Sequence, residues 1–164
     1  MKPIPFLTIH ALDQFIRGKG NLVVRLSHMK TLVNASGAEI DRGELLRFLA
    51  EMVWYPTAFL EDFVTWDALD AVSAKATIRF GELSVSGVFH FDSEGQIVRF
   101  TGERYREVNG KYLLDDWSTE MDEYREINGV LIPGKGKAIW KLAAGDFCYF
   151  EGEIVKITFN SIFS

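Results

Sequence analysis

The dipeptide Asn109-Gly110 restricts the fold of this chain more than any other feature of the sequence. An Asn-Gly pair between two strand-like runs is typical of a two-residue type I′ turn, because both central residues of that turn need positive φ angles. Such a turn fixes the register of its hairpin, so Arg104 should lie opposite Asp115 and Gly102 opposite Trp117. The dipeptide therefore predicts a long antiparallel hairpin.

Two further turns continue this pattern along the chain. Asn128-Gly129 predicts a second hairpin of the same type. The turn at residues 92–95 predicts another, in which Gly87 lies opposite the large ring of Phe100. Small residues facing large ones suit a curved surface, and a sheet with this many strands should coil.

Residues 41–56 form the one substantial helix that the sequence predicts. Asp41 suits the N-cap position, Glu44 completes a capping box, and Pro56 ends the helix. The apolar residues recur with helical spacing and form a stripe that must face a core: Leu45, Phe48, Leu49, Met52 and Val53.

These elements predict an α+β fold. We expect a strongly curved antiparallel sheet, shaped as a half-barrel, with one main helix over about residues 41–54 on its concave side. Two strands, residues 4–15 and 22–26, and a connection over residues 31–40 precede the helix. At 164 residues the chain is most simply a single domain, residues 1–164.

Charge and composition argue weakly against some classes of partner. The net charge of -5 and the lack of a basic run weigh against nucleic acid. No apolar run reaches the roughly 20 residues of a membrane span, and the apolar run near the N-terminus is too short for a signal peptide. As written, the chain is expected to be cytoplasmic. Its one cysteine, Cys148, forms no internal disulfide and is expected to pack as a small hydrophobe.

The sequence predicts no catalytic residue, no metal site and no cofactor. His10, His28 and His90 are far apart and lack neighbours at a metal-binding spacing, and the common catalytic motifs are absent. Asp115 and Asp116 are adjacent on a strand, so their side chains point to opposite faces and cannot act on one atom.

Arg104 is the most informative charged residue. The predicted register places it on the apolar face, opposite Asp115 and near Trp117, where it could orient the polar end of a ligand. The alternative is a salt bridge at the margin of the sheet, contributing about 0.2–1 kcal/mol. On the helix, Arg47 and Glu51 would matter only if their side of the helix faced the sheet.

Several segments resemble an uncharacterised bacterial family of unknown function. The helix GELLRFLAEMVWYPTAFL, the hairpin FDSEGQIVRFTGERYR and the hairpin YREINGVLIP match its pattern, and the likeness covers nearly the whole chain from about Asp13. Residues at matching positions are Arg47, Glu51, Trp54, Pro56, Arg104, Tyr105, Tyr124, Pro133 and Trp140. The succession of strands and turns is more loosely similar to that of the LolA and LolB lipoprotein carriers. This similarity implies a half-barrel over an apolar cavity.

The resemblance also implies that the chain is shortened at its N-terminus relative to the family. A shortened chain would leave an edge of the sheet open, through which a homodimer would form. A short natural variant, a fragment and a dimerising form are alternatives that the sequence leaves open.

We therefore expect a carrier or sensor that binds an apolar or lipid-like small molecule in the concave face of the sheet. The residues expected to line the site are Trp54, Phe89, Phe100, Trp117, Trp140 and Tyr149, with Arg104 and Asp115 at its polar end. Two alternatives remain open: an enzyme of unknown reaction on the same scaffold, and an interaction module whose own aromatic residues fill the cavity.

Overall fold

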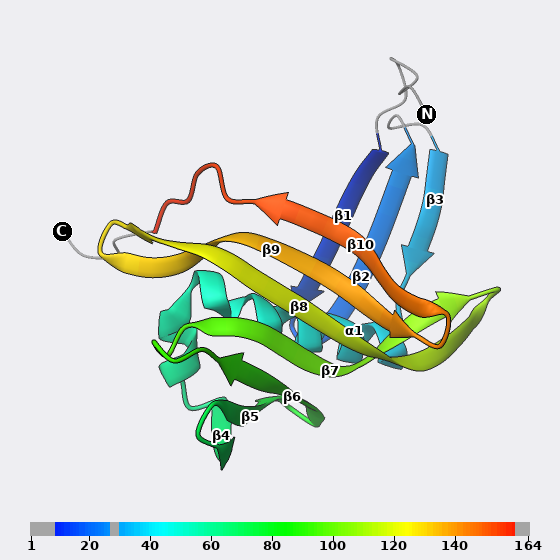
Figure 1. Ribbon diagram of the computed structural model, residues 1–164. Helices are drawn as coiled ribbons and strands as arrows, with labels where there is room; N and C mark the ends of the chain where they lie inside the picture. Colours follow the sequence, from blue (N-terminus) through cyan, green and yellow to red (C-terminus); the bar gives the residue numbers. More distant parts are fainter. Residues whose placement is uncertain (1–8, 27–29, 160–164) are drawn as a thin grey trace.

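The computed structural model describes residues 9–26 and 30–159 and contains two antiparallel sheets and one α-helix within them (Figure 1). The smaller sheet consists of β1 (Ile9–Ile16), β2 (Lys19–Leu26) and β3 (Lys30–Ala35). The helix α1 (Ala38–Glu51) follows, extended by the 3-10 helices η1 (Met52–Trp54) and η2 (Pro56–Leu60). The larger sheet consists of β4 (Val64–Asp70), β5 (Ser73–Phe80), β6 (Leu83–Phe91), β7 (Ile97–Val108), β8 (Lys111–Ile127), β9 (Val130–Leu142) and β10 (Gly145–Glu153).

Each strand of the larger sheet pairs with its neighbour in sequence, in the order β10-β9-β8-β7-β6-β5-β4. Asn109 and Gly110 adopt φ angles of 51° and 77°, and Arg104 lies opposite Asp115 as predicted. The turn at Asn128-Gly129 is confirmed in the same way, with φ angles of 53° and 79°. The α+β class, the antiparallel sheet and the main helix packed against it are therefore confirmed.

The predicted register between β6 and β7 is wrong by two residues. Phe89, not Gly87, lies opposite Phe100. The carboxylate of Asp92 accepts hydrogen bonds from the backbone N–H groups of Glu94 and Gln96, both at 2.9 Å, and holds a turn wider than a two-residue connection. A shift of two residues keeps every side chain on its face, so the predicted apolar and polar faces are unaffected.

The ladder between β6 and β7 ends at the pair Val88 and Thr101, although both strands continue beyond it. Gly87 lies just past this point, where a Cβ atom would overlap the ring of Phe100. The glycine is thus required because the fully buried Phe100 ring occupies the space of its missing side chain.

The helix begins earlier than predicted and its two expected capping residues have other roles. Gly37, with a φ of 129°, precedes the first turn, and no side chain caps it. Asp41 lies inside the helix, where its carboxylate accepts hydrogen bonds from the backbone N–H of Gly20 at 2.7 Å and from Lys19 Nζ at 3.1 Å. Asp41 therefore ties α1 to β2.

The predicted connection over residues 31–40 is also wrong, because residues 30–35 form β3, which pairs with β2. The two earlier strands are confirmed, with β1 beginning at Ile9 among the described residues and β2 running from Lys19 to Leu26. Residues 4–8 of the first predicted strand lie outside the described residues.

The core lies between α1 and the larger sheet. Four residues of the apolar stripe are at most 3% exposed, Leu45, Leu49, Met52 and Val53, while the fifth, Phe48, is partly buried. The aromatic residues Phe89, Phe100 and Trp117, which face the helix from the strands, are almost fully buried. The rings of Phe59, Phe89, Phe100 and Trp117 contact one another in sequence, with centroids 5.2, 4.7 and 6.1 Å apart. Full burial of each such side chain contributes about 1.5–3 kcal/mol. Among the described residues, no helix has both the length and the apolar character that crossing a membrane requires.

Candidate functional site

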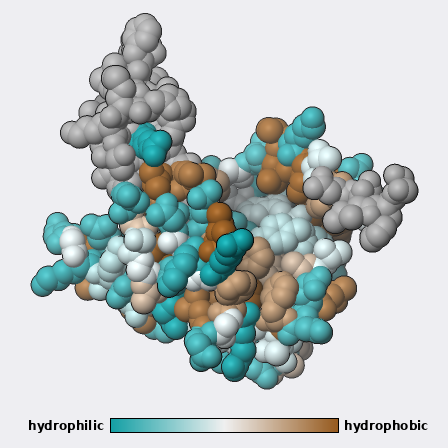
Figure 2. Space-filling model, turned by 180° about the vertical axis from the view of Figure 1, so that it is seen from behind, coloured by the Kyte–Doolittle hydropathy of each residue, from teal (hydrophilic) through white to brown (hydrophobic). Residues whose placement is uncertain are grey.

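A cavity of about 560 Å³ lies between α1, β2 and strands β8–β10. This volume is within the range of roughly 300–1,000 Å³ that is usual for small-molecule sites. Its walls are mostly apolar, and the residues that supply them include Leu22, Ala50, Trp54, Trp117, Met121, Ala138 and Phe150. The side of the molecule seen in Figure 2 is hollowed, with hydrophobic side chains at the surface beside the hollow.

Arg104 projects from β7 toward α1 and lies at the wall of this cavity. Its Nε donates to the carbonyl oxygen of Gly43 at 3.2 Å, and its Nη2 donates to Glu44 Oε1 at 2.8 Å. The guanidinium group also lies 5.3 Å from the ring centroid of Trp117, a cation–π distance. Arg104 therefore joins the helix to the sheet.

Asp115 is not the partner of Arg104. It lies opposite Arg104 in the ladder, as predicted, but its carboxylate binds Arg106 Nη2 at 2.7 Å and Nε at 2.8 Å. Arg104 reaches α1 instead, because Gly43 has no side chain and exposes its carbonyl at the point of contact. Asp115 therefore does not line the cavity, and Arg104 contacts the helix instead.

Glu44 forms the centre of a network of ion pairs. Its side chain is 2% exposed, and its second oxygen lies 2.8 Å from Arg47 Nη2. Arg47 Nη1 in turn lies 3.6 Å from Glu51 Oε1. The side of the helix that carries Arg47 and Glu51 faces the cavity, so the condition that would make these residues relevant is met.

Tyr149, on β10, contacts the guanidinium group of Arg104. Its hydroxyl oxygen accepts hydrogen bonds from Arg104 Nη1 at 3.2 Å and from Trp117 Nε1 at 3.1 Å. Its ring stacks on Trp140, with centroids 5.9 Å apart and an interplanar angle of 28°. Three aromatic residues from β8, β9 and β10 therefore surround one guanidinium group.

A β-bulge in β10 directs two aromatic side chains to the cavity. Cys148 pairs with Ile139 and Phe150 with Ala138, which leaves Tyr149 as the extra residue. Without the bulge, Phe150 would point to the opposite face, because side chains alternate along a regular strand. Gly152 pairs in register with Gly136 and leaves room for the ring of Phe150.

The aromatic residues and Arg104 that were predicted for the site lie in three places: the cavity, an adjoining cavity and the core. Those that line the cavity are Trp54, Arg104, Trp117 and Tyr149. Trp140 lines an adjoining cavity of about 210 Å³ that shares Arg104 and Tyr149 with the larger one. Phe89 and Phe100 are 0% exposed and belong to the core, since the helix covers the part of the sheet where they lie.

Sequence reasoning missed Glu44 and Phe150. Glu44 fits a capping box so well that its spacing gave no reason to expect a partner 60 residues away. Phe150 depends on the bulge, for which its own residues carry no signal. Trp54 was predicted, and its Nε1 donates to the carbonyl oxygen of Pro133 at 3.1 Å, which fixes the end of the helix on β9.

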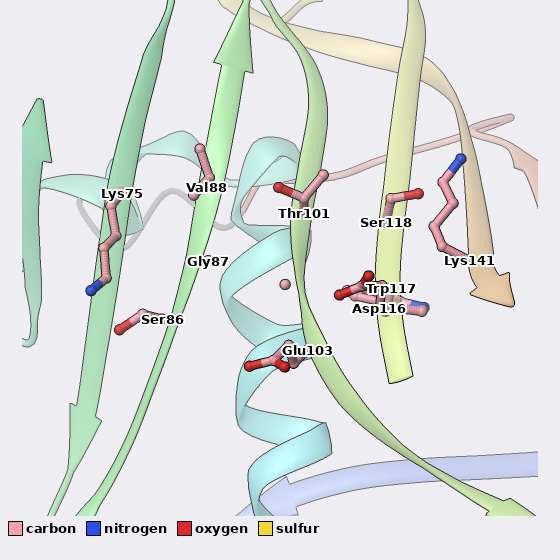
Figure 3. A pocket seen from close by; sticks show the side chains of 11 residues that line it. Lys75, Ser86, Gly87, Val88, Thr101, Glu103, Asp116, Trp117, Ser118 and Lys141 are labelled. Carbon is pink, nitrogen blue, oxygen red and sulfur yellow. The ribbon is translucent and has the colours of Figure 1, made fainter. Parts of the chain in front are cut away.

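A second hollow of about 570 Å³ lies over β5–β9 (Figure 3). It is lined by hydroxyl groups and by both signs of charge, including Lys75, Glu103, Asp116 and Lys141. The two hollows are nearly equal in volume, so their linings distinguish them. Only the one beside α1 combines a wide apolar wall with a small cluster of polar groups, the combination that small-molecule sites favour.

The histidines and the cysteine add no reactive cluster. Among residues 9–26 and 30–159, no three His, Cys, Asp or Glu side chains are grouped so as to hold a metal ion. His90 hydrogen-bonds Thr101 at 3.2 Å, and burial, with Arg99 adding to it, lowers the pKa of its imidazole. The side chain of His10 and the whole of His28 lie outside the described residues. Cys148 is exposed and not packed as predicted, since its strand is at the edge of the sheet.

Comparison with known proteins gives one match. The model of a family described as "Family of unknown function (DUF6920)" matches residues 1–159. Neither the curated proteins nor the solved structures gave a match.

Proposed function

The chain belongs to the DUF6920 family of unknown function, and we propose that it binds an apolar or lipid-like small molecule, as a carrier or sensor. The binding site is the cavity between α1 and strands β8–β10. The observation that carries this proposal is a space of about 560 Å³ with mostly apolar walls and one polar cluster, Arg104 and Tyr149. Apolar walls favour an apolar ligand, and convergent polar groups fix its orientation.

The arrangement favours binding over the two alternatives. An interaction module with a self-filled cavity is disfavoured because the space beside α1 is not filled by the described side chains. An enzyme would need ionisable groups available to a substrate. Each carboxylate oxygen of Glu44 instead lies 2.8 Å from a guanidinium nitrogen, of Arg104 or of Arg47. Arg104, Arg47 and Glu51, three charged groups at the wall, are thus engaged in one network through Glu44.

The proposal is tested by binding and by obstruction of the cavity. The protein is purified without detergent and studied by native mass spectrometry, and its affinity for the neutral apolar dye Nile red is measured by fluorescence. We expect a bound lipid-like mass or dye binding, and we expect Ala138→Phe, which places a ring in the cavity, to abolish it. Ala68→Phe, on the exposed strand β4, is the matched control.

Either of two results would contradict the proposal. One is a protein that carries no apolar molecule and binds no dye. The other is dye binding that Ala138→Phe leaves unchanged although the variant is folded by circular dichroism, because the dye would then sit elsewhere.

The half-barrel shape and the likeness to LolA and LolB belong to the same proposal. It is supported by the position of α1 on one face of the larger sheet (Figure 1). The cavity lies between this helix and the sheet. A crystal structure with a bound lipid would test it. A ligand located away from the space between α1 and the sheet would contradict it.

We also propose that a second copy of the chain pairs along β10. This strand is one edge of the larger sheet, and Phe147 and Phe150 on it are each 56% exposed. Edge strands with exposed apolar residues favour pairing with another strand. Light scattering after size exclusion should show a dimer that Phe147→Lys converts to a monomer, and a monomeric wild-type protein at high concentration would contradict the proposal.

A further inference from the structure

We propose that the molecule bound in the cavity is uncharged at its polar end and carries a hydrogen-bond acceptor, such as an ester. A carboxylate or a phosphate is disfavoured. This inference rests on the proposed function and deepens it, because it names the chemical class of the ligand. It is carried by the charges around the cavity and by one hydroxyl group.

The first observation is that the charges around the cavity leave no positive charge in excess. The cations at its wall are Arg47, Arg104 and Lys137, and the anions at its wall are Glu51 and Glu120. Glu44, which pairs with Arg104 and Arg47, supplies the third negative charge. Lys137 Nζ in turn lies 3.5 Å from Glu151 Oε1, so the described ionic groups around the site carry three positive and four negative charges and leave no positive charge in excess.

An anionic ligand would be opposed by this distribution of charge. The two cations nearest the polar cluster, Arg104 and Arg47, already share Glu44, whose side chain is 2% exposed. A second carboxylate beside them would lie close to Glu44 with little water to screen the repulsion. An uncharged group avoids both this repulsion and the cost of removing a charge from water.

The second observation is a hydroxyl hydrogen for which the described part of the chain offers no acceptor. The Tyr149 oxygen accepts hydrogen bonds from Arg104 and Trp117, and no acceptor for its own O–H lies among the described residues. Tyr149 is 41% exposed, so its O–H is open to solvent and to a ligand in the cavity. The three residues that meet at this hydroxyl all line the cavity. Accepting from a guanidinium group polarises the phenol and strengthens it as a donor. A neutral acceptor on the ligand, such as an ester carbonyl, is the natural partner for it.

The experiment compares two ligands that share one apolar chain. Methyl laurate is neutral and laurate is anionic at neutral pH, and each is titrated against the protein with bound Nile red. We expect methyl laurate to displace the dye at a concentration at least about tenfold lower than laurate. The two ligands also differ in their affinity for water, so the ratio of their dissociation constants is compared between variants, where that difference cancels.

Two variants change the charge balance. Glu44→Gln removes one negative charge with little change in shape, so laurate should gain affinity relative to methyl laurate by about tenfold. This is a gain of binding, which an unfolded protein cannot produce. If Glu44→Gln does not fold, Glu51→Gln tests the effect of the charge instead. The carboxylate of Glu51 is more exposed than that of Glu44, and Glu51 lines the same cavity.

A third variant tests the hydroxyl. Tyr149→Phe should weaken methyl laurate binding by about fivefold, the value of one neutral hydrogen bond. Tyr105→Phe is the matched control, since Tyr105 does not line the larger cavity.

The outcomes separate this inference from the proposed function. If wild-type protein binds neither the dye nor either ligand, the proposed function fails. If it binds laurate as tightly as methyl laurate, or if the folded charge variants leave the ratio unchanged, the function stands and the neutral-ligand inference is overturned.

Discussion

Arg104 joins the helix to the sheet through its guanidinium group. Its side chain is 12% exposed, and its three hydrogen bonds reach Gly43, Glu44 and Tyr149. The position opposite Asp115 was predictable, because an Asn-Gly turn fixes the register. The partner was not, because a long side chain reaches whatever the tertiary fold brings within range.

We predict that Arg104→Leu destabilises the protein by about 3 kcal/mol, because it leaves the buried Glu44 with one of its two guanidinium partners removed. Arg106→Leu is the matched control on the same face of the same strand. Arg106 and Asp115 are 28% and 25% exposed, so that change should cost less than about 1 kcal/mol. Urea denaturation of both variants measures the difference. Equal losses would show that the network around Glu44 adds nothing beyond an exposed salt bridge.

At the scale of elements, the sequence predicted most of what local chemistry controls. The two Asn-Gly hairpins, the apolar stripe of α1 and the polar and apolar faces of the strands follow from turn geometry and periodicity. The start of α1 and the roles of Asp41 and Glu44 could not be predicted from turn geometry or periodicity. A carboxylate near a helix N-terminus can either cap the helix or bind another element, and local sequence does not decide between the two. The bulge in β10 likewise depends on packing against β9.

We predict that Asp41→Ala loosens β2 from α1. The buried backbone N–H of Gly20 would lose its acceptor, which costs about 1–3 kcal/mol. Hydrogen exchange should therefore speed up in β1–β3 while β7–β9 are unchanged. Asp41→Asn, which keeps an acceptor oxygen, should have a smaller effect, and Asp67→Ala on the exposed strand β4 should have none. Faster exchange throughout the larger sheet would contradict a local role for Asp41.

At the scale of the whole molecule, buried phenols make stability depend on alkaline pH. Burial is the largest cause that raises the pKa of Tyr124 from 10.0 to about 12, with Asp92 adding to it, although a 2.8 Å hydrogen bond to Ile97 opposes the rise. Burial also raises the pKa of Tyr55, and Glu51 adds to that effect. The folded state therefore keeps protons that the unfolded state has released.

We predict that the free energy of unfolding falls as the pH rises from the ordinary tyrosine pKa of 10.0 toward the folded pKa of about 12. In that interval the unfolded state binds fewer protons than the folded state, so rising pH favours unfolding; below it the contribution is fully present. Tyr124→Phe should make the slope shallower in urea denaturation across this interval. Tyr105→Phe is the control, and an unchanged slope in Tyr124→Phe would contradict the prediction.

The order of strands in the larger sheet has a consequence for how the protein folds. Every ladder in it joins strands that are neighbours in sequence, so each requires only a short loop to close. The contacts that complete the cavity join residues that are far apart in sequence. Trp54 and Pro133 are 79 residues apart, and Arg104 and Glu44 are 60 residues apart. We expect strand pairing to come first and docking of α1 to come late. A ligand would then hold the finished molecule together and slow its unfolding, without speeding its folding.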